Sequence, residues 1–297
     1  MAIGTVLGVG EARLEQLLLL ERYPEAESNV DLLGFSLQGA GTAATALAVL
    51  AKLGVPTRFV GKVADDYFGR FVRTGLGALG VDTRALIAQP GGVTPSHVVL
   101  VAAGRARHTV LRAQGTVAAL ELDELPAELL AGAGLLVVDG AQPAVALALV
   151  ARARAAGVPV VFDASGPSAA VAELTASADV VIATERYLVQ VAPRGELEAS
   201  MQAVLELGPR TVIVTMGREG SVGLQGEKLV RQPPLLIEVA DTTGAGDVFL
   251  GGYCYGLLQD LPLERCMQLA SAAAGLSCRS LGPRSGLPSL AELQAAL

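Results

Sequence analysis

The chain has 297 residues, of which 52% are hydrophobic and 4% aromatic, and a net charge of -7. A chain of this length and composition can bury a large core, and we expect one main folded domain. The negative charge and the few aromatic residues argue against a nucleic-acid partner, which needs clustered cations and stacking side chains. Apolar runs stay short of the roughly 18 residues that a membrane helix needs. With no secretory pattern after Met1, we predict a cytoplasmic protein without a membrane partner.

The first part of the chain predicts strands interrupted by two helices. An alanine-rich run over residues 42–53 ends at Gly54 and predicts one helix, and Asp65-Asp66 is the expected N-terminal cap of a second helix over 67–79. Apolar runs bounded by polar turns predict strands over residues 4–10, 12–20, 29–37 and 57–61, and a hairpin over 96–103 and 107–111.

Beyond Leu120 short apolar runs alternate with alanine-rich segments. We expect strands over residues 135–139, 158–162, 180–183 and 211–215, and helices over 143–156, 169–176 and 196–207. This alternation is typical of a parallel sheet with helices on both faces. The prediction is therefore an α/β fold with a doubly wound, mostly parallel sheet, whose ligands lie at the carboxyl ends of the strands.

One segment carries the clearest chemical signal: Asp241-Thr242-Thr243-Gly244-Ala245-Gly246-Asp247, followed by an apolar run over 248–253 that predicts a helix. The glycines allow a tight turn, and a helix N-terminus offers unpaired N–H groups and partial positive charge, so together they predict an anion hole. A carboxylate beside a bound anion repels it. Asp247 therefore suggests a base that accepts a proton from an attacking hydroxyl during phosphoryl transfer. The alternative is that Asp247 only caps the helix.

This segment resembles, residue for residue, the signature of the ribokinase family of carbohydrate kinases, the phosphofructokinase B type. The family's Gly-x-Val-Gly-Asp-Asp-x-x-Gly block is similar to Gly61-Lys62-Val63-Ala64-Asp65-Asp66-Tyr67-Phe68-Gly69, and the resemblance covers nearly the whole chain. It implies an ATP-dependent carbohydrate kinase with Asp247 as the catalytic base. It also implies that Mg²⁺ bridges the nucleotide phosphates and that the amides of Gly244, Ala245 and Gly246 stabilise the transferring phosphoryl group.

Two further segments resemble the nucleotide site of this family. Residues 214–221 look like its strand-end turn, and residues 270–276 look like the helix that lines the adenine. The resemblance implies nucleotide contacts from Thr215, Gly217, Gly220, Thr243, Ala270 and Ala274. It further implies that Asp241 and Thr243 hold a monovalent cation such as K⁺, for which the alternative is ordinary turn stabilisation.

The acceptor side departs from the family pattern. Thr45 replaces the asparagine of the usual Gly-Gly-x-x-x-Asn block and lacks its reach, and Glu15 stands in place of an aspartate. Glu185 is left to serve Mg²⁺ through water, because Thr184-Glu185-Arg186-Tyr187 replaces an Asn-x-x-Glu motif. We expect substrate contacts from Glu15, Gly41, Thr42, Thr45, Arg112 and Asp247, with Arg112 meeting an anionic substituent. The alternatives are a Thr45 packed in its helix, a solvated Arg112 and an exposed Glu185.

The two β-rich patches correspond to the family's lid, which closes over the sugar and often pairs with a second subunit. We therefore expect a lid of residues 13–38 and 95–112, a main domain of residues 1–12, 39–94 and 113–297, and a homodimer formed through the lid. The threonine at position 45 and the tail over 278–288 resemble the branch that includes ketohexokinase and sulfofructose kinase.

That branch implies a small sugar substrate, a fructose-like or sulfofructose-like ketose. Three alternatives stay open: a nucleoside kinase, a 2-keto-3-deoxygluconate kinase, and a sugar-sensing protein without turnover. The altered Asn-x-x-Glu motif favours the sensor, whereas Asp247 argues against it.

Overall fold

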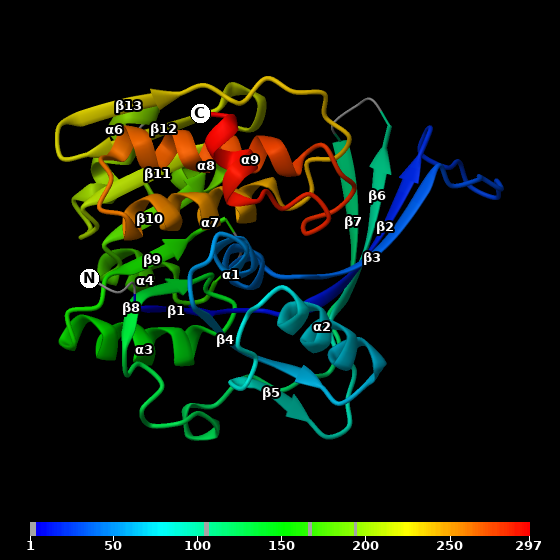
Figure 1. The fold of residues 1–297 in the computed structure, drawn as a ribbon, viewed down its shortest axis with the longest axis horizontal. Helices are drawn as coiled ribbons and strands as arrows, with labels where there is room; N and C mark the ends of the chain where they lie inside the picture. The colour runs from blue at the N-terminus through cyan, green and yellow to red at the C-terminus, as the bar shows by residue number, and fades with distance from the viewer. Residues whose placement is uncertain (1–3, 104–106, 166–167, 193–194) are drawn as a thin grey trace.

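The structure is a computed structural model that describes residues 4–103, 107–165, 168–192 and 195–297. Within these residues the chain forms a nine-stranded sheet in the order β13-β12-β11-β10-β9-β8-β1-β4-β5 and a separate four-stranded sheet in the order β3-β2-β6-β7. Figure 1 shows helices packed around the larger sheet and the smaller sheet projecting from one end of it. The predicted α/β fold with a small β-sheet is confirmed.

The larger sheet is parallel except at one edge. Its parallel strands are β1 (Thr5–Val9), β4 (Thr57–Ala64), β5 (Leu86–Gln89), β8 (Ala133–Val138), β9 (Val160–Asp163), β10 (Val180–Thr184) and β11 (Thr211–Thr215). The antiparallel strands β12 (Ser221–Gln225) and β13 (Lys228–Gln232) extend the edge beyond β11. The sequence patterns predicted the parallel strands except β5, and they did not predict β12 and β13.

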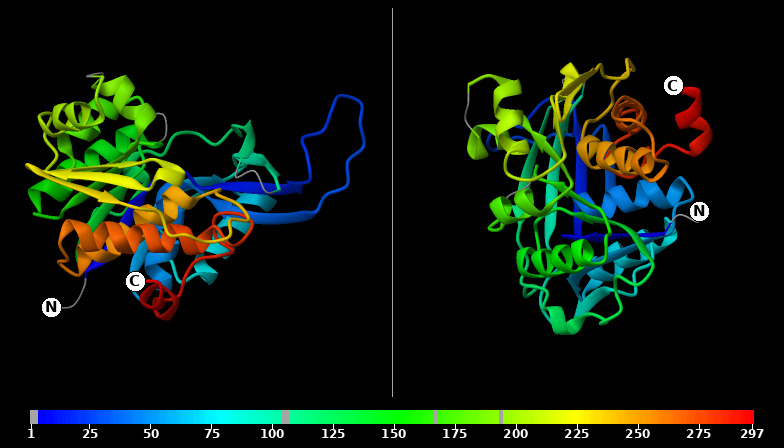
Figure 2. Two further views of the ribbon diagram at one scale, coloured as in Figure 1. Left: turned by 90° about the horizontal axis from the view of Figure 1, so that it is seen from above. Right: turned by 90° about the vertical axis from the view of Figure 1, so that its left-hand side faces the viewer.

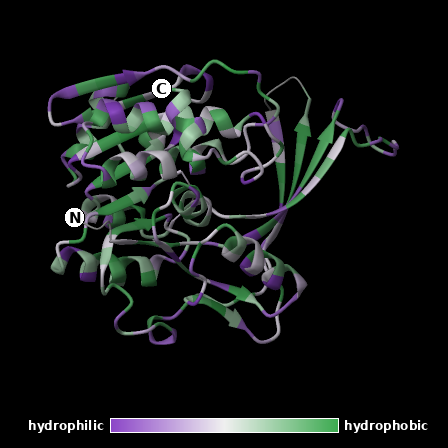
Figure 3. Cartoon of the chain, in the orientation of Figure 1, coloured by the Kyte–Doolittle hydropathy of each residue, from purple (hydrophilic) through white to green (hydrophobic). Residues whose placement is uncertain are grey.

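Helices cover both faces because successive side chains of a strand point to opposite sides. Val6 belongs to one core, which includes side chains from α1 (Thr42–Lys52), α2 (Tyr67–Ala78), α7 (Ala245–Leu258) and α8 (Leu263–Ser277). Leu7 belongs to the other core, with α3 (Pro143–Ala155), α4 (Val171–Ser177), α5 (Glu185–Val191) and α6 (Leu197–Leu205). The short helix α9 (Leu290–Ala295) contacts α8. Burial of both faces explains why the sequences of the central strands are continuous apolar runs. These strands are mainly green, the colour of hydrophobic residues, in Figure 3.

The four-stranded sheet joins two distant parts of the chain. β2 (Arg13–Leu20) pairs antiparallel with β3 (Gly34–Ala40), β6 (Ser96–Ala102) pairs antiparallel with β7 (Arg107–Ala113), and β2 runs parallel to β6. Figure 2 shows this sheet, and the long connection between β2 and β3, extending beyond the main layers. The limits of the lid and the main domain stay a prediction.

One predicted strand is placed too early. The expected strand over 29–37 begins only at Gly34, because β2 ends at Leu20 and residues 29–32 lie beyond its end, where no β2 backbone is left to pair with. The turn expected between β6 and β7 includes residues 104–106, which lie outside the described residues. Across the described part of the chain, no helix has the length and apolar character needed to cross a membrane.

Candidate active site

Two cavities meet at the N-terminus of α7. The first, of about 480 Å³, lies where β2, β6 and β7 approach the larger sheet, and charged and polar side chains dominate its lining. The second, of about 500 Å³, lies between α7, α8 and the turn after β11, and its lining is mainly apolar. Both are lined by Thr242, Ala245 and Gly246. A ligand in one cavity can therefore approach a ligand in the other at this turn.

Glycine at position 244 is required by the backbone. Gly244 is the N-cap of α7 with a left-handed φ of 77°, and an added Cβ would lie 2.3 Å from the Cβ of Pro283. At Gly246 an added Cβ would meet no protein atom within 4 Å, because this residue faces the cavities. The turn thus combines a tight backbone path with open space for a ligand.

The first turn of α7 presents unused backbone donors. The N–H of Ala245 donates to the carbonyl oxygen of Thr242 at 3.1 Å and that of Val248 donates to Gly244 at 3.0 Å. In the described parts of the chain, the N–H groups of Gly244, Gly246 and Asp247 have no backbone acceptor. The helix N-terminus therefore carries backbone donors of the kind that the expected anion hole needs, with Ala245 engaged in the turn itself.

Asp247 lies beside these donors and lines the first cavity. Burial raises the pKa of its carboxyl group to about 6, opposed mainly by the charge of Arg13 and by a hydrogen bond from the Thr42 side chain. The N-cap of α7 is Gly244, so the helix-capping alternative for Asp247 does not describe its position. A carboxylate with this pKa is mostly ionised at neutral pH and can accept a proton.

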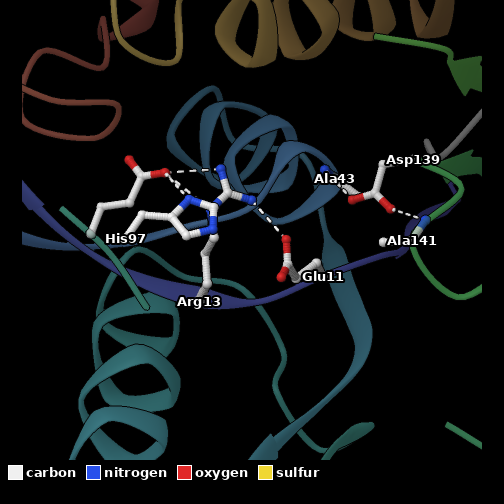
Figure 4. Close-up of polar contacts among 7 residues, drawn as sticks. Glu11, Arg13, Ala43, His97, Asp139 and Ala141 are labelled. Carbon is white, nitrogen blue, oxygen red and sulfur yellow. Dashed lines mark hydrogen bonds and ion pairs between the residues drawn. The ribbon is translucent and has the colours of Figure 1, made fainter. Parts of the chain in front are cut away.

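A hydrogen-bonded ionic cluster lines the first cavity on the side of β2 (Figure 4). Arg13 Nε and Nη2 donate to Glu15 Oε1 at 3.0 and 2.9 Å, and Nη1 donates to Glu11 Oε2 at 3.0 Å. His97 Nδ1 lies 3.7 Å from Glu15 Oε1. Burial alone would raise the pKa of Glu15, but the neighbouring His97 and the hydrogen-bonded guanidinium of Arg13 outweigh it and hold that pKa below its usual value.

Sequence reasoning singled out Glu15 but missed Glu11 and Arg13, and it assigned no role to His97 or His108. Both histidines line the first cavity. A signal for Glu11 and Arg13 was available. Residues 11, 13 and 15 are charged and alternate with apolar residues, and this alternation places the charged side chains on one face of a strand.

Two buried carboxyl groups at strand ends support the first cavity from the larger sheet. Asp139, after β8, accepts hydrogen bonds from the backbone N–H of Ala43 at 3.3 Å and of Ala141 at 3.0 Å, and it thereby holds the N-terminus of α1 (Figure 4). Asp163, at the end of β9, accepts a hydrogen bond from the Ser165 hydroxyl. Burial raises the pKa of Asp139 to about 6 and that of Asp163 to about 7. The signal missed here was an acidic residue after each apolar strand.

Of the expected substrate-binding residues, the structure brings Glu15, Thr42, Arg112 and Asp247 together on the first cavity. Gly41 and Thr45 are not among its lining residues. A Cβ at Gly41 would lie 2.0 Å from the carbonyl oxygen of Glu11, so this glycine allows two backbones to approach. The Thr45 side chain is fully buried and its hydroxyl accepts a hydrogen bond from Arg284 Nε at 3.2 Å, which agrees with the packed alternative.

The expected nucleotide residues are divided between the two cavities. Thr215, Gly217, Gly220 and Ala274 line the second cavity, whereas Thr243 lines the first. Ala270 lines neither, because α8 turns it toward α7, where a Cβ added at Gly252 would lie 2.9 Å from the Ala270 Cα. The apolar wall also includes side chains that sequence reasoning did not find, since they follow no regular pattern: Leu235, Ile237 and Phe249.

The sequence suggested two metal positions, Glu185 for Mg²⁺ and Asp241 with Thr243 for a monovalent cation. Glu185 is exposed at the start of α5 and lines neither cavity. Asp241 is buried; its Oδ1 accepts from the Thr243 N–H at 3.0 Å and the Thr243 hydroxyl at 2.8 Å, and its Oδ2 accepts from the Gly282 N–H at 2.8 Å. Among the described residues, no group of three or more His, Cys, Asp or Glu could hold a metal ion. The hydrogen bonds of Asp241 and Thr243 are those that the turn-stabilising alternative expects.

The second cavity has the features that ATP requires. Its apolar lining suits a planar base, and it leads to the free N–H groups of α7, which suit phosphate oxygens. The polar first cavity lies on the other side of the same donors, beside Asp247.

Comparison with known proteins agrees with this geometry. The family model described as "pfkB family carbohydrate kinase" matches residues 9–290. The chain is 30% identical to a ribokinase from Arabidopsis thaliana over 94% of this chain and 77% of that protein. It is 29% identical to an ATP-dependent ribose-1-phosphate kinase from Halopiger xanaduensis over 94% of each.

A solved structure of Arabidopsis thaliana ribokinase in complex with ribose and ATP superposes on 100% of this chain and 99% of that one, with a TM-score of 0.84 and 26% identity. The signature turn, the two adjoining cavities and these similarities agree. The chain belongs to the pfkB family of carbohydrate kinases and is an ATP-dependent kinase.

Proposed function

We propose that this kinase transfers the γ-phosphoryl group of ATP to a hydroxyl group of a fructose-like or sulfofructose-like ketose. ATP occupies the second cavity with its phosphates at the N-terminus of α7, and the sugar occupies the first. The observation that carries this assignment is the position of Asp247, which lines the first cavity beside the backbone donors that both cavities share.

In the proposed reaction Asp247 accepts the proton of the attacking hydroxyl while the bond to the γ-phosphorus forms. The N–H groups of Gly244 and Gly246 donate to the oxygens of the transferring group, whose charge the helix N-terminus also stabilises. The Thr42 side chain favours the ionised form of Asp247. The leaving ADP takes the electron pair of the broken phosphorus–oxygen bond.

Mg²⁺ bound with the nucleotide would neutralise phosphate charge. The described acidic residues offer few ligands for it, so we expect the phosphates and water to supply most of its coordination, with Glu185 contributing through water at most. K⁺ near Asp241 and Thr243 stays a prediction. Both carboxylate oxygens of Asp241 already accept hydrogen bonds from the protein.

The lining of the first cavity favours a sugar over a nucleoside. It contains many hydrogen-bonding groups and no Phe, Tyr or Trp side chain within the described residues, whereas a nucleobase is normally held by aromatic or apolar surfaces. A sugar acid such as 2-keto-3-deoxygluconate is the second candidate, because Arg112 is exposed on the cavity wall and has no ion-pair partner in the described ranges.

A panel assay tests the function. Purified protein with MgATP is offered fructose, sulfofructose, ribose, 2-keto-3-deoxygluconate and adenosine, and ADP release is followed beside Asp247→Asn. Release that depends on a ketose and is lost in the variant supports the proposal. Binding of a sugar without any acceptor-dependent release would instead support the sugar-sensing alternative.

We also propose that the lid pairs with a second copy of this chain. His108, Val110 and Arg112 of β7 line the first cavity, so the intervening Leu111 faces the other side of the sheet, where it is 53% exposed. Phe35 of β3 is 59% exposed. Light scattering of the purified protein should give the mass of a dimer, and Leu111→Glu should give a monomer; a monomeric parent protein would refute this pairing.

A further inference from the structure

We propose that Gln38 is a positioning residue for phosphoryl transfer, because it holds residues 281–285 against the turn before α7. We call residues 281–285 the tail segment; they lie between α8 and α9 in the chain. This inference rests on the proposed function, which assigns the transferring phosphoryl group to the backbone donors of that turn, and it adds a residue of the four-stranded sheet that keeps these donors in place.

The Gln38 side chain is joined to both ends of the tail segment. It lies near the end of β3 and is 9% exposed. Its Oε1 accepts a hydrogen bond from the backbone N–H of Arg284 at 2.8 Å, and its Nε2 donates to the carbonyl oxygen of Leu281 at 2.9 Å and to the Ser285 hydroxyl at 2.6 Å. A backbone donor and a backbone acceptor fix the direction of the amide. An amide therefore matches both partners, and a carboxylate does not.

Apolar packing also attaches the tail segment to the four-stranded sheet. Leu281 packs against a cluster of buried side chains that includes Leu17 of β2 and Val99 of β6. Gly282 has a left-handed φ of 89°, and a Cβ added there would lie 2.4 Å from the Nε2 of Gln38. The main chain of the tail segment therefore passes directly along the Gln38 amide, with no room for a side chain between them.

The tail segment in turn supports the turn before α7. The Gly282 N–H donates to Oδ2 of Asp241 at 2.8 Å, and Oδ1 of Asp241 accepts from the N–H and the hydroxyl of Thr243 at 3.0 and 2.8 Å. Pro283 lies so close to Gly244 that a Cβ added to this glycine would be 2.3 Å from the Pro283 Cβ. A displacement of the tail segment would therefore displace the turn that carries the free backbone donors of α7.

Gln38 acts on the reaction through the tail segment and touches no ligand itself. It lines neither cavity, whereas Pro283 and Gly244 line the first. Donors aimed at a transferring phosphoryl group are most effective when the protein holds them in place before the reaction. Loosening the tail segment should therefore weaken binding of the transition state more than binding of the nucleotide in its ground state.

Three variants test the inference against the wild type. Gln38→Met keeps the length of the side chain and removes its hydrogen bonds. Gln38→Glu keeps the acceptor for the Arg284 N–H but sets a carboxylate oxygen against the carbonyl oxygen of Leu281. The matched control is Gln89→Met. The Gln89 side chain also accepts a hydrogen bond from a distant backbone N–H, that of Ala118 at 2.8 Å, and it lines neither cavity.

The assay measures kcat with an acceptor that the wild type phosphorylates. Calorimetry in the presence of this acceptor gives the affinity for MgADP with and without aluminium fluoride, which mimics the transferring phosphoryl group. We expect Gln38→Met and Gln38→Glu to lose roughly 10- to 100-fold in kcat and a similar factor in affinity for MgADP with aluminium fluoride. The affinity for MgADP alone should stay within about twofold, and Gln89→Met should match the wild type. A purely structural role would weaken MgADP binding equally with and without aluminium fluoride.

Leu281→Ala provides an independent test, because it loosens the same segment through its apolar contact. It should show the same selective loss, and it decides the question if Gln38→Met does not fold. An unchanged kcat in the folded Gln38→Met, or in Leu281→Ala where Gln38→Met does not fold, overturns the role of Gln38 and leaves the kinase assignment intact. Equal weakening of MgADP binding with and without aluminium fluoride does the same. Absence of turnover by the wild type with every acceptor of the panel overturns the proposed function and this inference with it.

Discussion

The dependence of phosphoryl transfer on pH tests Asp247 as the base. Its pKa is raised from 3.8 to about 6, chiefly by burial, and only the ionised carboxylate can accept a proton. The rate should therefore be full at high pH and fall as the pH drops through 6. For a single ionisation, about 90% of the enzyme is active at pH 7, half at pH 6 and about a tenth at pH 5. We expect this profile in kcat/KM for the acceptor.

Thr42 provides a specific perturbation of that profile. Its side chain donates a hydrogen bond to the ionised form of Asp247, so Thr42→Val should raise the pKa and move the acidic limb to higher pH. A hydrogen bond worth about 0.5–1.5 kcal/mol corresponds to a displacement of about 0.4 to 1 pH unit. Thr42→Ser keeps the hydroxyl and should keep the limb in place.

The assay measures phosphorylated product directly between pH 4.5 and 8.5, so that no coupling enzyme contributes its own pH dependence. Asp139 and Asp163 also have pKa values of about 6 and 7, and the Thr42 pair distinguishes them, since Thr42 hydrogen-bonds to Asp247. A flat profile from pH 7.5 to pH 5, a limb near pH 4, or equal displacement by both Thr42 variants would refute Asp247 as the base.

Four further predictions concern the site and the core. Asp247→Asn should lower kcat by roughly 10²- to 10⁴-fold in product formation while ATP binding, measured by calorimetry, is retained. Ala274→Phe should fill the second cavity and raise the KM for ATP at least about tenfold, with the acceptor KM little changed. The raised pKa of Asp163 gives a contribution to stability that is present below pH 3.8 and is lost as the pH rises through 7. Because Asn stays uncharged, the melting temperature of Asp163→Asn minus that of the wild type should be larger at pH 8 than at pH 5. Phe162 is fully buried, and Phe162→Ala should cost about 3–5 kcal/mol in denaturant unfolding.

Much of the fold could be predicted because its signals are local. The strand expected over residues 211–215 has those bounds as β11, and the helix expected over 42–53 is α1, Thr42–Lys52. Apolar runs of strand length and alanine-rich helical stretches are visible within a few neighbouring residues. The hairpin of β12 and β13 was missed because β13 is a polar edge strand, with Lys228 and Leu229 exposed, and it carries no apolar run.

The sequence by itself determined the turn before α7 and the place of Asp247 beside it, because these residues are contiguous and the preference of glycine for a left-handed φ acts at a single position. The grouping of side chains around the first cavity was decided by the tertiary structure alone. Glu15 faces His97 only because β2 and β6 pair in that register, and Asp139 reaches the N-terminus of α1 from a strand 96 residues away. Strand pairing and burial, which depend on the whole chain, bring these charged groups together and set their pKa values.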